Sequence, residues 1–400
     1  MRTGDIISGT SQYLMNTYGR YPIAMVRGKG SWVWDSEGKK YLDFVTGIAV
    51  NNLGHCHPNV VKAISGQSRK LVQVCNLYHI EKQVEFAKML VENSFADKVF
   101  FCNSGAEANE GAIKLARKWG GANGGRYKVV HARDSFHGRT LGALSATNKK
   151  YQKGFEPLVP GFKSVPYGQI DPLEKALGDD KVCAVLLEPI QGENGVIMPY
   201  ANFLRDARRL CKRKNVLLIL DEIQVGLGRT GKLFSYEHYG IKPDIMTLAK
   251  ALGGGIPCGA VLATDAVAKH LSPGNHGTTL GGNPLAMCAG IAVLKTIIED
   301  GLLDNAAGMG EYFLSGLLKI KDEFGDTVRD VRGKGLILGV EFVNAETAKD
   351  VVVRCSNNGL LTILTEQKVM RILPPLTVKK NEIEHALKII RRSLKEAARA

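Results

Sequence analysis

Two charged side chains stand at the ends of strongly apolar runs, where they could do chemistry. The first is Asp221, which directly follows the run Val216–Leu220. In an open parallel sheet, ligands bind at the carboxyl ends of the strands. A carboxylate with little water around it is stable only beside a cation or strong hydrogen-bond donors. Asp221 is therefore a candidate partner for a cationic group of a ligand, and capping of a following helix is the alternative.

The second charged side chain is Lys250, which follows the apolar run Ile245–Leu248 and precedes the glycines Gly253–Gly255. A lysine among apolar side chains loses the solvation of its charged form. Its pKa falls for this reason, and its amine becomes a usable nucleophile. A lysine that only extends its ammonium group from a strand end into water would give the same pattern.

Two turns after other strands could hold an anion and a flat ring. Asn103–Glu110 opens a helix after the strand Lys98–Cys102, and a small, glycine-containing turn of this kind leaves backbone N–H groups free to bind a phosphate. A plain strand-to-helix turn is the alternative. Phe136 and Arg139 follow the strand Tyr127–His131, where an aromatic ring could stack on a ligand and an arginine could bind a carboxylate.

Two further patterns indicate other chemistry. Gly226–Lys232 has the spacing of a nucleotide-binding P-loop, but Leu233 occupies the position of the magnesium-binding Ser or Thr, and the segment does not follow directly on a strand. His55–His57 could suggest zinc, but alternate side chains point in opposite directions and no partner cluster is evident. We therefore expect no metal site, and a nucleotide hydrolase is kept only as an alternative from a different class.

Composition limits the classes of protein that these motifs can belong to. The chain has 400 residues, of which 44% are apolar and 23% charged, the balance of an ordinary globular protein. It shows no membrane span, secretory signal or convincing transit peptide. The eight cysteines form no C-x-x-C pair, which indicates reduced thiols and a cytoplasmic location. The net charge of +14 is dispersed, so that a solvated basic surface is favoured over nucleic-acid binding.

The apolar runs that must position these side chains alternate with helical stretches, which is typical of a parallel sheet covered on both faces. We therefore predict an α/β fold. The predicted strands are Lys98–Cys102, Tyr127–His131, Val182–Leu187, Val216–Leu220, Ile245–Leu248 and Ala260–Ala263.

The two ends of the chain have a different character. The alternation in Gly28–Asp35 and Lys40–Phe44 predicts a hairpin. We expect a long helix from about Asn283, a strand over Val331–Val340 and a final helix over Asn381–Arg399. The predicted organisation is a large domain over residues 58–282 and a smaller α+β domain built from residues 1–57 and 283–400.

In this order, the motifs closely resemble those of the class III pyridoxal-phosphate-dependent aminotransferases, and the resemblance covers nearly the whole chain. The motifs that carry it are Tyr41–Phe44, Asn52–Pro58, Phe101–Asn109, Phe136–Arg139, Glu188–Glu193, Leu220–Gly226, the segment around Lys250, and His276–Pro284. The resemblance implies the fold-type-I architecture with a mostly parallel sheet, pyridoxal 5'-phosphate as cofactor, and a homodimer with its active sites at the interface. No membrane or nucleic-acid partner is expected.

The resemblance also implies a role for each site residue. Lys250 would bind the cofactor covalently and move a proton during the reaction, and Asp221 would pair with the protonated pyridine nitrogen. Arg139 and Arg371 would bind substrate carboxylates, with Glu193 as the partner of Arg371. The other expected cofactor contacts are Gln224 at the phenolic oxygen, Phe136 on the ring, Glu188 beneath the site, Ser104, Gly105 and Ala106 at the phosphate, and Thr279 reaching the phosphate from the other subunit.

The reaction implied by the resemblance is transfer of the terminal amino group of N-acetylornithine to 2-oxoglutarate. The products would be N-acetylglutamate 5-semialdehyde and glutamate, in a step of arginine biosynthesis. Ornithine, succinylornithine, 4-aminobutyrate and carrier-linked lysine precursors are alternative amino donors, because loops form the part of the pocket that would distinguish them.

Overall fold

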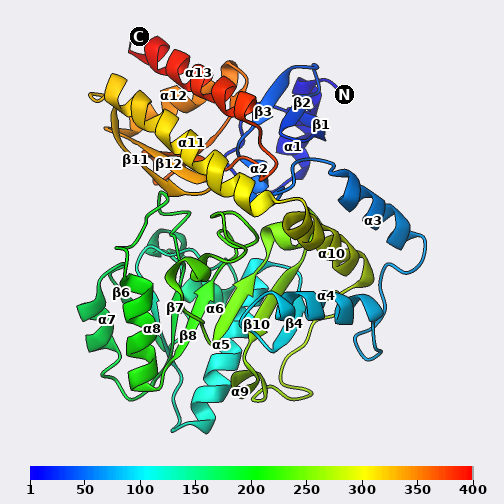
Figure 1. Ribbon diagram of the computed structural model, residues 1–400, viewed down its shortest axis with the longest axis vertical. Helices are drawn as coiled ribbons and strands as arrows, with labels where there is room; N and C mark the ends of the chain where they lie inside the picture. Colours follow the sequence, from blue (N-terminus) through cyan, green and yellow to red (C-terminus); the bar gives the residue numbers. More distant parts are fainter. Residues whose placement is uncertain (399–400) are drawn as a thin grey trace.

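The computed structural model describes residues 1–398, and a seven-stranded sheet of order β4-β10-β9-β8-β7-β5-β6 forms its centre (Figure 1). Strands β5 to β9 pair in parallel, whereas β10 is antiparallel to both of its neighbours. The α/β fold with a mostly parallel sheet is thus confirmed. The strands are β4 (Lys98–Cys102), β5 (Lys128–Ala132), β6 (Phe162–Val165), β7 (Val182–Leu187), β8 (Leu217–Asp221), β9 (Ile245–Leu248) and β10 (Gly259–Ala263).

All six strands predicted for this sheet are present, with ends displaced by at most one residue. The expectation of parallel pairing is wrong at β10. Parallel neighbours need a crossover of a dozen or more residues, and the connection from Leu248 to Gly259 is too short for one. Strand β6 was not predicted, because two of its four residues are exposed at the sheet edge and it carries no long apolar run.

Helices cover both faces of the central sheet. Alternate residues of β8 belong to two hydrophobic clusters. Leu218 and Leu220 belong to the cluster that also contains residues of α8 (Phe203–Lys214) and α10 (Pro284–Glu299), and Leu217 and Ile219 belong to the cluster that contains residues of α5 (Gly105–Ala122). The other helices before α10 are α1 (Thr3–Tyr13), α2 (Thr46–Ala49), α3 (Pro58–Ser68), α4 (Glu81–Glu92), α6 (Leu141–Ser145), α7 (Ile170–Ala176) and α9 (Asp265–Ala268). The expected helix from Asn283 is α10, for which Asn283 is the N-cap.

Two smaller sheets contain the remaining strands. The first has the order β1-β2-β3-β13 and joins β1 (Met25–Lys29), β2 (Trp32–Asp35) and β3 (Lys40–Asp43) to β13 (Leu360–Leu361). The predicted hairpin is present as β2 and β3, but Gly28–Asp35 is divided between β1 and β2. The second sheet has the order β11-β12-β15-β14, with β11 (Val328–Lys334), β12 (Ile337–Phe342), β14 (Ile363–Thr365) and β15 (Val369–Ile372).

The prediction of one strand over Val331–Val340 is wrong. The chain turns between Lys334 and Ile337, so that β11 and β12 pair with each other in antiparallel fashion. Helices α11 (Leu302–Glu323), α12 (Ala345–Asn357) and α13 (Lys380–Ala397) accompany this sheet in the same part of the molecule as both chain termini (Figure 1). The predicted end of the last helix, Arg399, lies outside the described residues, and the proposed domain limits stay a prediction.

The cysteines, the helices and His55 test the alternatives raised by the composition and by the segment His55–His57. All eight cysteines are free, and five of them are buried. Within residues 1–398, no helix is long and apolar enough to cross a membrane, and no three His, Cys, Asp or Glu side chains are grouped as metal ligands. His55 instead contacts a carboxylate, with 2.7 Å between its Nε2 and Asp43 Oδ2.

Candidate active site

A cavity of about 460 Å³ opens at the carboxyl ends of the central parallel strands. The amino end of the antiparallel strand β10 reaches the same edge, where Pro257 and Cys258 complete the wall. Of the predicted site residues, those that line the cavity are Ser104, Gly105, Ala106, Phe136, Arg139, Glu188, Asp221, Gln224 and Lys250. Glu193, Arg371 and Thr279 are not part of this lining.

Lys250 projects into the cavity from the segment that follows β9. Its φ angle of 48° lies in the left-handed region, which a residue other than glycine adopts only where its surroundings enforce it. Desolvation by the surrounding protein lowers the pKa of Lys250 to about 8, although Glu193, Asp221 and Glu188 act in the opposite direction. The amine has no hydrogen-bond or ion-pair partner in residues 1–398. The arrangement therefore provides an unpaired amine that loses its proton more readily than the amine of a solvated lysine.

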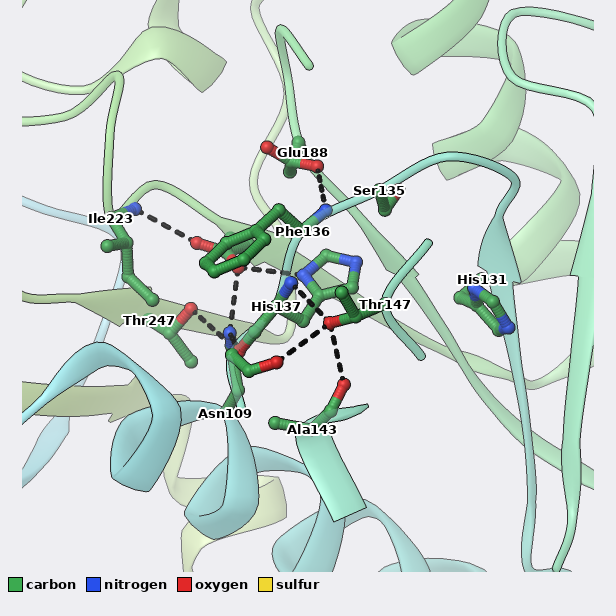
Figure 2. A network of polar contacts seen from close by, with 12 residues as sticks. Asn109, His131, Ser135, Phe136, His137, Ala143, Thr147, Glu188, Ile223 and Thr247 are labelled. Atoms are coloured by element: carbon green, nitrogen blue, oxygen red, sulfur yellow. Dashed lines mark hydrogen bonds and ion pairs between the residues drawn. The ribbon is translucent and has the colours of Figure 1, made fainter. Parts of the chain in front are cut away.

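Asp221 ends strand β8 and receives three hydrogen bonds, from residues that are labelled in Figure 2. Its Oδ2 accepts from His137 Nδ1 and Asn109 Nδ2, both at 2.8 Å, and its Oδ1 accepts from the Ile223 backbone N–H at 3.0 Å. No helix begins between residues 222 and 234, so the alternative that Asp221 is a helix cap does not apply. A carboxylate oxygen accepts about two hydrogen bonds, and Oδ1 therefore keeps one position for a donor.

Glu188 follows β7 and is buried near the Asp221 carboxylate. Burial raises the pKa of Glu188 to about 7, and the charge of Asp221 adds to the effect, whereas His137 and Lys250 oppose it. The Phe136 backbone N–H donates to Glu188 Oε1 at 2.8 Å. Glu188 thereby fixes the segment that carries the Phe136 ring.

The turn before α5 has the features of an anion cup. Ser104 is the N-cap, and its hydroxyl accepts from the Glu107 N–H at 3.2 Å. The N–H groups of Gly105 and Ala106 have no partner among residues 1–398 and lie at the positive end of the helix. A Cβ at Gly105 would lie 2.9 Å from the Ile223 side chain, so a larger residue at this position would require the Ile223 side chain to shift.

Arg371 of β15 is fully buried and forms an ion pair with the partly exposed Glu193 at the edge of the site. Its Nη1 lies 2.7 Å from Glu193 Oε1 and also donates to Gly192 O at 2.9 Å and Gln224 Oε1 at 3.1 Å. Burial would raise the pKa of Glu193, but Arg371, with Lys250, holds it below its usual value. Within the described chain, Nε and Nη2 of Arg371 have no partner. This edge of the guanidinium has the geometry that binds a carboxylate through two parallel bonds.

The second predicted arginine is held differently. The Arg139 guanidinium carbon lies 4.0 Å from the centre of the Tyr151 ring and 5.5 Å from that of Phe136, and Tyr151 meets Phe136 edge-on. Arg139 forms no ion pair with any residue from 1 to 398. A cation that is held by aromatic faces and lacks a counter-ion can bind an incoming anion.

Thr279 lies apart from the cavity of its own chain. It is exposed, and its backbone carbonyl accepts from Gln73 Nε2 at 2.6 Å. The neighbouring Thr278 reaches Asn103, with 3.1 Å between the Thr278 hydroxyl and Asn103 Nδ2. The structure thus brings all the predicted site residues except Thr279 to one edge of the sheet or its immediate border.

The comparisons with known proteins agree with this geometry. The family model for class III aminotransferases matches residues 13–394. The chain belongs to the class III aminotransferase family. A relative named acetylornithine aminotransferase, from Caldanaerobacter subterraneus subsp. tengcongensis, is 53% identical to it over 388 residues, which are 96% of this chain and 98% of the relative.

Solved structures of other aminotransferases share the fold. The ornithine aminotransferase from Toxoplasma gondii ME49 matches with a TM-score of 0.97 and 35% identity, covering 100% of this aminotransferase and 96% of that chain. The acetylornithine aminotransferase from Elizabethkingia anophelis matches with a TM-score of 0.89 and 35% identity, covering 99% and 100%.

Three polar or aromatic residues of this aminotransferase were not assigned a role from the sequence. Asn109 and His137 hold Asp221, and Tyr151 stacks on Arg139. Asn109 could have been noticed, because asparagine is unfavourable inside a helix and lies one turn beyond Gly105. Tyr151 lies in a short 3-10 segment between two lysines and a glutamine, and nothing in that pattern points to an active site.

The alternative of a P-loop at Gly226–Lys232 is not supported by the structure. Arg229 in this segment is fully buried, and its guanidinium donates to the carbonyl oxygens of Leu336 and Pro374 and to Asn52 Oδ1. The segment therefore links the central sheet to the elements around β12 and β15. It does not open a helix that could bind a phosphate.

Proposed function

We propose that the protein transfers the terminal amino group of N-acetylornithine to 2-oxoglutarate, with pyridoxal 5'-phosphate as its cofactor, in arginine biosynthesis. The observation that carries the proposal is the unpartnered amine of Lys250 in a cavity that also contains Asp221, with Arg139 and the Arg371–Glu193 pair beside it. The names of relatives that match 96% of the chain, acetylornithine aminotransferases, support the acylated donor.

The residues of the cavity fit pyridoxal phosphate. Gly105 and Ala106 offer unpaired N–H groups for a phosphate, and Asp221 Oδ1 has room for one more donor, as a protonated pyridine nitrogen would supply. Phe136 would cover one face of the ring, and Gln224 would contact the phenolic oxygen. When bound, the cofactor supplies an electron sink that stabilises negative charge at the substrate carbon.

Lys250 is suited to moving a proton as well as to holding the cofactor. A general acid or base works best when its pKa lies near the operating pH, and desolvation brings that of Lys250 to about 8. Glu188 and Asp221 lie in the same enclosed space and limit this decrease, because their negative charge favours the ammonium form.

The two arginines explain how one pocket accepts two unlike substrates. Glutamate has one carboxylate beside its reacting carbon and a second at its far end, whereas N-acetylornithine reacts through its terminal amine and carries its only carboxylate at the far end. Arg139 would bind the distal carboxylate of both. Arg371 would bind the proximal carboxylate of glutamate, and Glu193 would neutralise Arg371 when N-acetylornithine presents only methylene groups there.

A homodimer is part of the proposal. Large apolar side chains are exposed in the segment between α3 and α4, among them Leu77 at 89% and Tyr78 at 68%, and Leu280 is 56% exposed beside Thr279. Exposed apolar patches of this kind typically mark protein interfaces. Contact through these segments would allow Thr279 to approach the phosphate cup of the partner subunit.

The proposed location of the protein is the cytoplasm. The free cysteines support this proposal, because thiols stay reduced in that compartment.

Steady-state measurement of kcat/KM with four amino donors tests the function. We expect N-acetylornithine to exceed N-succinylornithine, ornithine and 4-aminobutyrate with 2-oxoglutarate as acceptor. A higher kcat/KM for ornithine would reject the acylated donor but retain the aminotransferase. A purified protein without visible cofactor absorbance, and without transfer from any of the four donors, would reject the cofactor as well.

A further inference from the structure

We propose that Asn109 is a positioning residue for Asp221, an inference that rests on the proposed function. Asn109 lies in α5, is fully buried, and makes three side-chain hydrogen bonds (Figure 2). Its Nδ2 donates to Asp221 Oδ2 at 2.8 Å and to the His137 carbonyl at 2.7 Å. Its Oδ1 accepts from the Thr247 hydroxyl at 2.9 Å.

These partners permit only one orientation of the amide. Both Nδ2 hydrogens face oxygens that can only accept, namely the Asp221 carboxylate and the His137 carbonyl. Rotation of the amide by 180° would place Oδ1 against the same two oxygens. The Thr247 hydroxyl reinforces the observed orientation, because it donates to Oδ1. Thr247 therefore acts on Asp221 through Asn109.

Asn109 and His137 together occupy the accepting positions of one carboxylate oxygen. Because a carboxylate only accepts, His137 Nδ1 carries the hydrogen that reaches Oδ2. With Oδ2 filled by two donors from different elements, the position that remains for a ring N–H is on Oδ1. Two charge-assisted bonds also stabilise the negative charge that would pair with a protonated pyridine ring.

The same side chain connects three parts of the site. Asn109 lies one helical turn after Gly105 of the phosphate cup. Thr247 lies on β9, three residues before Lys250. Asp221 on β8 is the register partner of Thr247. One buried amide thus fixes the cup, the carboxylate and the strand that precedes the lysine relative to one another.

The test uses the full-length protein and four variants, with binding of pyridoxal 5'-phosphate as the readout instead of turnover. Asn109→Asp keeps the shape but replaces the donors with a second carboxylate, and two carboxylates this close cannot both be ionised. Thr247→Val removes the orienting hydroxyl, and Thr247→Ser retains it. Thr296→Val is the matched control, since Thr296 is also buried and its hydroxyl accepts from Asn59 at 3.0 Å, on α10 away from the cavity.

We expect Asn109→Asp to raise the dissociation constant of pyridoxal phosphate by about ten- to a hundredfold, the range for bonds to a charged group. Thr247→Val should raise it severalfold and change the pH dependence of the bound cofactor's absorbance. Thr247→Ser should restore both to within about twofold of wild type. Thr296→Val should lower the thermal midpoint only.

The inference is overturned if Thr247→Val lowers the thermal midpoint as Thr296→Val does but leaves the dissociation constant and the absorbance profile unchanged, because the hydroxyl would then be structural only. The threonine pair decides the matter even if Asn109→Asp fails to fold. A wild-type protein that does not bind pyridoxal phosphate would overturn the proposed function, and this inference with it. If wild type binds pyridoxal phosphate and the Asn109 and Thr247 variants bind it equally tightly, the inference is overturned and the proposed function is retained.

Discussion

Lys250 and Glu188 are ionisable side chains of opposite type that share one cavity, and desolvation moves both of their pKa values toward neutrality. Each is thereby able to exchange a proton under ordinary conditions. A bulk-exposed pair would have its pKa values several units apart. At the scale of single residues, the chemistry of this site therefore depends on burial as much as on residue type.

The first prediction concerns Lys250. Lys250→Ala should abolish amino transfer and the visible absorbance of bound cofactor, because no other amine lines the cavity within residues 1–398. Lys175→Ala, on the exposed face of α7, is the control and should retain both. Normal turnover by Lys250→Ala would contradict the proposed role.

The second prediction separates the two arginines. Arg139→Ala should slow both half-reactions, whereas Arg371→Ala should slow mainly the glutamate half. Glu193→Ala should shift preference toward glutamate, because it leaves Arg371 without its neutralising partner. Charge-assisted bonds contribute about 1.5–3 kcal/mol, which corresponds to roughly ten- to hundredfold changes in rate. Single-turnover rates of each half-reaction check this, and equal losses in both halves for Arg371→Ala would contradict the assignment.

The third prediction follows from the raised pKa of Glu188. A carboxyl group with a folded-state pKa of about 7, above its unfolded value of 4.5, favours the folded state most at low pH, and this contribution is lost as the pH rises through about 7. Glu188→Gln removes this dependence and keeps an acceptor for the Phe136 N–H. Relative to wild type, the variant's thermal midpoint should therefore rise by a few degrees between pH 5 and pH 8. A difference that stays constant with pH would show that Glu188 is already ionised at pH 5.

The sequence predicts the charged residues that follow apolar strands, but not the residues that hold those side chains in position. Asp221 and Lys250 are visible because a charge directly after a buried strand is unusual. Asn109 and Tyr151 acquire their roles from contacts with residues far away in the chain: Asn109 meets Asp221 across 112 positions. Such contacts depend on how the strands are ordered in the sheet, which the local pattern does not specify.

At the scale of elements, the long apolar runs predicted the presence of strands well. The direction in which each strand runs was harder to predict. The run Ala260–Ala263 has the composition of the parallel strands of the sheet, and only the short connection before it shows that β10 must run the other way. The run Val331–Val340 contains a turn at Gly335 that its alternating residues conceal. Burial determines composition, whereas connection length determines pairing.

The fourth prediction compares two glycines in the single helix α11. A Cβ at Gly308 would meet no atom within 4 Å, whereas a Cβ at Gly310 would lie 2.3 Å from the Gly335 carbonyl oxygen. Gly308→Ala should therefore raise the thermal midpoint, because alanine stabilises a helix by roughly 0.5–1 kcal/mol relative to glycine. Gly310→Ala should lower it, because the helix must move away from the turn between β11 and β12. Equal shifts in the two variants would contradict this packing.

At the scale of the whole molecule, the proposed dimer predicts complementation between two defective subunits. Lys250→Ala disables its own site, and Thr279→Ala weakens the phosphate cup of its partner. In a mixed dimer both defects fall on one site, and the other site is intact. Random subunit exchange should therefore restore about a quarter of wild-type activity. No recovery, with exchange verified by mass spectrometry, would place Thr279 in its own subunit's site.

The strand order of the central sheet also has a consequence for the time at which the pocket forms during synthesis. Strand β4, which leads into the phosphate cup, pairs only with β10, about 160 residues later in the chain. A nascent chain therefore cannot dock the cup until residue 263 has left the ribosome, and Arg371 follows more than a hundred residues after that. Until then, β4 must remain without its pairing partner β10. The cofactor can therefore stabilise only a polypeptide whose synthesis is almost complete.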